Sequence, residues 1–166
     1  FSFWVNHNRT NTGIILQGVN AVAIGSSSGN MNQGENSVAI GINSGEDNQK
    51  ENTIALGNNA GQFRQDVNSV AIGLNAGQTK QSSGSVAIGL FAGTLTQGGN
   101  CVAIGGYAGF ISQGGNSVSI GTNAGQNNQG VNSVAIGSNA GQTGQSSGSV
   151  AIGNNSGSTL QGLNAV

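Results

Sequence analysis

The sequence has little charge, no proline and almost no cysteine, and each absence excludes a class of protein. Only 5% of its 166 residues are charged, against about 25% in an ordinary globular domain. Four basic residues and a net charge of −1 exclude the basic surface that binds nucleic acid. The single cysteine, Cys101, excludes an intramolecular disulfide framework. No apolar run approaches the roughly 20 residues of a membrane span.

The few charges are confined to the first half of the chain. Lys80 is the last of them, and residues 81–166 contain no Asp, Glu, Lys or Arg. In that half, Asn, Gln, Ser and Thr must supply solubility, or the surface must pack against a partner. The acidic residues do not recur once per turn, as they do in calcium-binding β-rolls. We therefore expect solvated surface charge, with no metal and no cofactor.

A period of sixteen residues organises the chain. From Asn20 the pattern N-S-V-A-I-G-x-N-A-G-x-x-x-Q-G-x repeats nine full times, and a tenth copy begins at Asn164. Places in the repeat are numbered from this Asn, so that Gly25 is at the sixth place. Strict phase without insertions indicates stacked, equivalent units. We predict two regions. Residues 1–19 form a degenerate coil with an apolar docking strand, and residues 20–166 form a solenoid.

The segment S-V-A-I predicts a β-strand, because apolar residues alternate and β-branched residues dominate. Sixteen residues are too few for a helix pair, and the 31 glycines oppose helix formation. We therefore predict an all-β fold, a parallel β-solenoid of sixteen-residue coils with two short strands per coil. Side chains two apart share a face of a strand, and the bulky third and fifth places are expected to fill the core. The predicted core columns are Val38, Ile40, Val70, Ile72, Val86, Ile88, Val102, Ile104, Val134 and Ile136.

Two invariant glycines mark the first corner of each coil. They stand at the sixth and tenth places, where a tight turn favours positive φ, and include Gly41, Gly45, Gly73, Gly77, Gly105 and Gly109. Amide side chains recur in two further columns and predict hydrogen-bonded ladders along the stack. The ladder residues are Asn43, Asn59, Asn75, Asn123, Asn139, Gln65, Gln81, Gln97, Gln113 and Gln129.

Nothing in the sequence predicts an enzyme. The only histidine, His7, has no recurring nucleophile or orienting group beside it, so it makes no catalytic triad. The Gly-x-x-x-Gly spacing from the sixth to the tenth place is followed by no Gly-Lys-Ser/Thr and opens no helix, so it is not a phosphate loop. We expect no catalytic, cofactor-binding or metal-binding residue.

The hexapeptide N-S-V-A-I-G at residues 36–41, 68–73 and 132–137 resembles the head repeat of YadA-like trimeric autotransporter adhesins. The longer pattern I-G-x-N-A-G-x-x-x-Q-G is also similar to repeat proteins of large algal DNA viruses and phage fibres. The resemblance covers residues 20–166. It implies a left-handed coil, three chains packed side by side, and a place outside the cell or on a cell or virion surface.

Three functions fit this pattern. The first is a structural protein that self-assembles into a fibre or filament by coil stacking, since the chain stops within a coil and begins with an apolar segment. The second is a trimeric adhesin or receptor-binding head that recognises a host surface ligand or glycan. The third is ice binding, which the irregular twelfth place disfavours. We expect copies of the chain as partners, head-to-tail or side by side, with a host surface ligand or glycan for the adhesin, and neither nucleic acid nor membrane insertion.

Candidate assembly contacts are of three kinds. Two aromatic residues, Phe91 and Tyr107, occupy the eighth place of neighbouring coils and should stack, with Phe110 close by. The alanines of the fourth place are expected to face outward as a smooth lateral strip. The remaining candidates are the apolar ends, and the complete set is Phe1, Phe3, Trp4, Ala87, Ala103, Phe91, Tyr107 and Val166.

Overall fold

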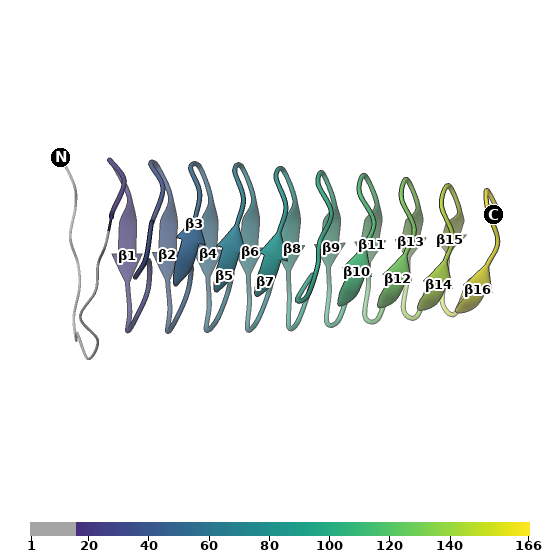
Figure 1. The fold of residues 1–166 in the computed structure, drawn as a ribbon. Coiled ribbons are helices and arrows are strands. Elements are labelled where there is room, and N and C mark those ends of the chain that lie inside the picture. Colours follow the sequence, from purple (N-terminus) through teal and green to yellow (C-terminus); the bar gives the residue numbers. More distant parts are fainter. Residues whose placement is uncertain (1–15) are drawn as a thin grey trace.

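The computed structural model describes residues 16–166 as a straight stack of equivalent coils (Figure 1). Coil 1 comprises residues 20–35, and each later coil follows after sixteen residues, to coil 9 at 148–163. In this part of the chain there is no helix, and every strand pairing is parallel. The predicted parallel β-solenoid is confirmed. The candidate contacts Phe1, Phe3 and Trp4 lie outside the described residues, as does most of the predicted region 1–19.

One continuous sheet of nine three-residue strands runs along the stack. Each strand pairs with the next at an offset of sixteen, so that Val86 lies beside Val102 and Ala87 beside Ala103. At about 4.8 Å per strand, the sheet is roughly 40 Å long. Its strands are β1 (Val22–Ile24), β2 (Val38–Ile40), β4 (Ile54–Leu56), β6 (Val70–Ile72), β8 (Val86–Ile88), β9 (Val102–Ile104), β11 (Val118–Ile120), β13 (Val134–Ile136) and β15 (Val150–Ile152).

The other side of the stack carries two shorter sheets. The first contains β3 (Asp47–Gln49), β5 (Phe63–Gln65) and β7 (Thr79–Gln81). The second contains β10 (Ile111–Gln113), β12 (Asn127–Gln129), β14 (Thr143–Gln145) and β16 (Thr159–Gln161). They are separated at coil 5, where residues 94–96 form no strand. Two short strands per coil are thus the rule, and coils 1 and 5 depart from it, since the second side of coil 1 forms only isolated bridges at Met31 and Gln33.

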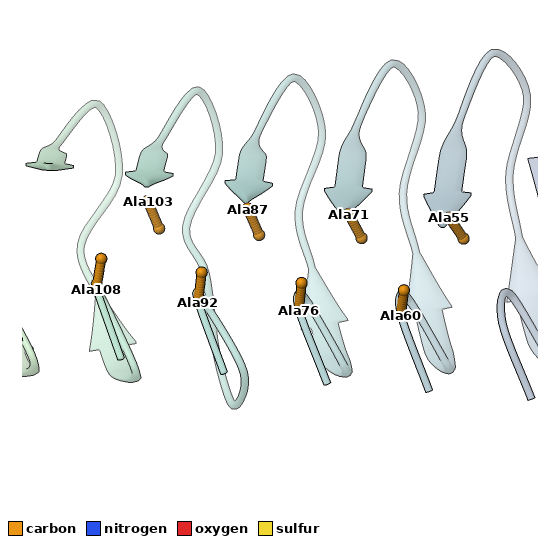
Figure 2. Packing of buried hydrophobic residues seen from close by; sticks show 8 residues of the cluster. All are labelled: Ala55, Ala60, Ala71, Ala76, Ala87, Ala92, Ala103 and Ala108. Atoms are coloured by element: carbon orange, nitrogen blue, oxygen red, sulfur yellow. The ribbon is translucent and has the colours of Figure 1, made fainter. Parts of the chain in front are cut away.

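The core is built of alanine, and this corrects the prediction from the sequence. Ala87 and Ala103 are 0% exposed, and the alanines of the fourth place point inward toward those of the ninth place (Figure 2). The predicted core columns Val38, Ile40, Val70, Ile72, Val86, Ile88, Val102, Ile104, Val134 and Ile136 are half-buried or exposed. The assignment of Ala87 and Ala103 to an outward strip was also wrong.

The physical reason is the thinness of the coil. Side chains of the second, fourth, ninth and fourteenth places fill the interior, and these are Ser, Ala, Ala and Gln in the repeat. A Cβ added at Gly77 would lie 2.7 Å from Gln81 Oε1 and 3.2 Å from the methyl group of Ala71. Two walls this close have no room for rows of Val and Ile, which therefore take the outer face.

The sixth-place glycine lets consecutive coils approach each other. Gly73 has a φ of 126°, and a Cβ there would lie 2.6 Å from the carbonyl oxygen of Gly89 in the next coil. The six turn glycines, Gly41, Gly45, Gly73, Gly77, Gly105 and Gly109, all have φ between 51° and 132°. Conformation and contact both require glycine at this corner.

Candidate interaction surfaces

The outer surface of the nine-stranded sheet is apolar and carries no charge. Its strands read Val-Ala-Ile with conservative replacements, and alternation places the third and fifth residues on the same outward side. Ile40 is 38% exposed, Ile104 36% and Ile152 63%. We call the outward side chains of these nine strands the Val/Ile face. A monomeric soluble protein rarely exposes an apolar patch of more than a few hundred Å², and this strip runs the length of the stack.

Amide ladders follow the corner beside this face. Asn43 donates to Asn59 at 3.1 Å, and Asn59 donates to Asn75 at 2.9 Å. Beyond coils 5 and 6 the same column resumes, with Asn123 donating to Asn139 at 3.0 Å. These residues have φ of 53–57°, in the left-handed region that Asn tolerates better than other residues with a side chain. Backbone conformation and stacking therefore both favour Asn in this column.

The fourteenth-place glutamines lie inside the coil and link its two walls. In coil 5, Gln97 Nε2 donates to the carbonyl oxygen of Val86 at 2.8 Å and to Gln113 Oε1 at 3.1 Å. The inter-coil ladder is discontinuous. It joins 17–33, 49–65, 81–97–113 and 129–145–161, while Gln65 makes no such bond to Gln81. At another break, between Gln113 and Gln129, the hydroxyl of Ser119 donates to Gln129 instead.

Replacing Gln97 with Ala should destabilise the solenoid by about 2–3 kcal/mol. The change removes the buried hydrogen bonds that Gln97 makes with Val86, Gln113 and Gln81 and opens a cavity. Chemical denaturation followed by circular dichroism measures the loss. Gln161→Ala is the matched control, because Gln161 is only partly buried and its removal should cost about 1 kcal/mol. Equal effects at both positions would contradict the interior role of the ladder.

Three aromatic rings gather at the corner of coils 5 and 6. Phe91 and Tyr107 stack with their ring centroids 5.1 Å apart and their planes 20° apart. Phe110 meets both rings edge-on, with centroid distances of 6.1 Å to Phe91 and 5.5 Å to Tyr107. All three side chains are half-buried. We call these residues the aromatic cluster.

The aromatic cluster interrupts the repeat in three ways. Phe91 and Tyr107 replace Asn at the eighth place yet keep its left-handed backbone, with φ of 55° and 57°, a conformation that is unfavourable for bulky side chains. Phe110 replaces the Gln or Asn common at the eleventh place. The second-side sheet breaks in coil 5, where buried Thr94 donates to the carbonyl oxygen of Asn75 at 3.0 Å.

Within residues 16–166, no group of three His, Cys, Asp or Glu side chains could hold a metal ion. In the same part of the chain, no helix is long and apolar enough to cross a bilayer. Cys101 is fully buried, and its thiol donates to the carbonyl oxygen of Gly114 at 2.9 Å. The charges of the first half lie at scattered places of the coil. The surfaces that distinguish this chain are therefore the Val/Ile face and the aromatic cluster.

Comparison with known families finds a match at two segments of the repeat. The model of the YadA head domain repeat matches the sequence at residues 33–44 and 129–140. These two segments are therefore similar to YadA head repeats. They begin 96 residues apart, which is six periods of sixteen, so both occupy the same places of the coil. No curated protein matches the sequence.

The sixteen-residue repeat accounts for the solenoid, but the two surfaces come from the structure. Sequence reasoning brought Phe91 and Tyr107 together and placed Phe110 near them, and the three rings are in contact. It missed the Val/Ile face because it directed those side chains inward. The remaining candidate contact, Val166, is fully exposed, and its role in assembly stays a prediction.

Proposed function

We propose that this chain is the rod-forming region of a non-enzymatic, surface-exposed adhesin-type protein whose copies associate side by side through the Val/Ile face. The observation that carries the proposal is the uncharged apolar strip along all nine strands. Exposed Ile side chains in continuous rows favour burial, at about 25 cal/mol per Å² of apolar surface removed from water. A YadA-type repeat agrees with a structural and adhesive role.

A second copy is the occupant that fits this face best. Its rows of Val and Ile carry the same spacing of about 4.8 Å per coil, so methyl groups of one copy can fill the grooves between rows of another, as in the dry interfaces of paired sheets. Three copies around an axis parallel to the rod form a closed assembly. The YadA resemblance favours that trimer, and with it a location on a cell or virion surface.

Lysine in place of Ile104 should abolish this association while the solenoid stays folded. Ile104 is 36% exposed, so a charged side chain reaches water in the monomer but is buried without a partner in the assembly. Sedimentation velocity at increasing concentration measures the change from assembly to monomer, and circular dichroism reports the fold. Asn128→Lys is the control, because Lys80 occupies the same thirteenth place in coil 4.

Two results would contradict the proposal. One is a wild-type chain that stays monomeric at high concentration, and the other is an Ile104→Lys variant that assembles like wild type. Growth into fibres by end-to-end coil stacking is a separate prediction, which electron microscopy distinguishes from lateral assembly by the length of the particles.

A further inference from the structure

At the aromatic cluster, several features of the repeat are interrupted together. The Asn ladder, the eleventh-place amides and the second-side sheet are all interrupted within coils 5 and 6. Asn at the eighth place would relieve the left-handed strain of Phe91 and Tyr107 and would complete the ladder from Asn75 to Asn123. Departures from a favourable local pattern concentrate at functional sites.

We propose that the aromatic cluster is a binding site for a neutral oligosaccharide. This inference rests on the proposed adhesive function and names the chemical class of its ligand. The rings supply an apolar surface for the C–H faces of sugar rings, and polar side chains around a few aromatic groups are typical of ligand sites.

The interrupted ladders supply the polar groups on both sides of the rings. The side-chain amide of Asn75 accepts from Asn59, and that of Asn123 donates to Asn139. Within residues 16–166, neither of these two side-chain amides bonds to a side chain of coils 5 and 6. The amides of the eleventh place are interrupted in the same way. Gln78 donates to Gln62 and Gln126 accepts from Gln142, and both bonds point away from the aromatic cluster. Amide donors and acceptors thus flank the rings, and sugar hydroxyls can bond to either kind.

The span of the site favours an oligosaccharide over a single sugar. Asn75 and Asn123 are three coils apart, which corresponds to about 14 Å along the stack. One sugar ring cannot reach both ladder ends, whereas a short chain of sugars lying along the axis can contact both ends and the rings between them.

The charge of the region selects a neutral ligand. Lys80 is the only charged side chain in coils 4 to 7, and coils 5 to 9 contain none, so the region offers little to attract an anionic sugar or an acidic peptide. The backbone at the cluster is already paired, since the N–H of Phe91 donates to Leu74 at 2.9 Å and that of Tyr107 donates to Leu90 at 2.8 Å. Recognition must therefore come from side chains, without the strand addition that captures extended peptides.

A variant that restores the repeat tests this site. Phe91→Asn combined with Tyr107→Asn should reduce binding of immobilised neutral oligosaccharides by about tenfold or more, the loss expected from about 1.4 kcal/mol of ring contacts. Its melting temperature should equal or exceed that of wild type, because the Asn column is completed. Phe63→Thr is the matched control. It removes an aromatic ring that is 42% exposed outside the cluster, restores a Thr found elsewhere at the twelfth place, and should bind as wild type does.

The probes are oligosaccharides ending in galactose, glucose, mannose or N-acetylglucosamine, with sialylated forms for comparison. The proposal is overturned if the wild type binds none of the neutral probes, or if the double variant binds them as well as wild type. It is also overturned if the double variant loses self-association, since the cluster would then contact a second copy. The two proposals can fail separately. A wild-type chain that binds the neutral probes but stays monomeric would overturn lateral assembly and leave this inference in place, and an assembling chain that binds none of them would do the reverse. The monomeric Ile104→Lys variant should still bind the probes, because Ile104 lies outside the aromatic cluster.

Discussion

Replacing Ala87 with Lys is expected to unfold the central coils. Ala87 is 0% exposed and lies in the buried cluster with Ala92, Ala71 and Ala103, where the coil has room for a methyl group. A lysine there brings both a long side chain and a charge into the interior. Overpacking and an unpaired buried charge together should destabilise the protein by about 5 kcal/mol or more. Loss of the β-sheet circular dichroism signal and of protected amides in hydrogen exchange measures the effect.

Ala87→Ser is the control for this change. Ser119 occupies the same place two coils later and is itself buried, so the serine variant should fold with a loss of about 1–2 kcal/mol at most. A lysine variant that keeps the solenoid intact and changes only its assembly would show that the fourth place faces outward, and the alanine core would be wrong.

Replacing Gly73 with Ala should destabilise the solenoid by about 3–5 kcal/mol. The residue needs a φ of 126°, which a residue with a Cβ adopts only with strain. In addition, its Cβ would lie 2.6 Å from the carbonyl oxygen of Gly89, and moving that oxygen disturbs the pairing of coils 4 and 5. Denaturant unfolding followed by circular dichroism measures the change.

Gly106→Ala provides the matched comparison. Gly106 is not held at positive φ, and a Cβ there would meet nothing within 4 Å. Removing a glycine from such a position stabilises a protein by about 0.4–1 kcal/mol, because the unfolded chain loses freedom. Similar losses at Gly73 and Gly106 would show that close stacking at the sixth place does not limit the fold.

The sequence predicts most of the fold, because the period alone specifies which residues lie above one another. A strict phase of sixteen requires Val86 beside Val102, and the structure has that pairing. The orientation of the strands was predicted wrongly. Alternation determines that Val86 and Ile88 share a face but not which face is inside, and side-chain bulk suggested the wrong one.

The repeat itself contains the signal that would have corrected this orientation. The third and fifth places vary as little as the fourth, so the signal lies in the size of the residues and not in how often they change. The fourth and ninth places contain only Ala or Ser, and the fourteenth only Gln. A closely packed interior restricts volume more than an open surface does. Restricted small residues, rather than large apolar ones, indicate the core of a thin coil.

The candidate site was only half predictable. Two aromatics sixteen residues apart must stack in such a solenoid, so contact of Phe91 with Tyr107 followed from the period. Their positive φ also follows in principle, since Asn in the same column indicates a left-handed position. The break in the second-side sheet did not follow, because no pattern in the sequence marks residues 94–96, where buried Thr94 donates to the carbonyl oxygen of Asn75, as a gap in the strands.

The Val/Ile face has a consequence for how neighbouring rods align. A surface that repeats every coil looks the same after a slide of one coil, so two copies have a series of near-equivalent alignments, each separated by about 4.8 Å. Each shift by one coil exposes to water the outward Val and Ile side chains of one coil in each copy. Full overlap is therefore preferred by an amount that grows with each step, and rods of equal coil number are favoured to end flush.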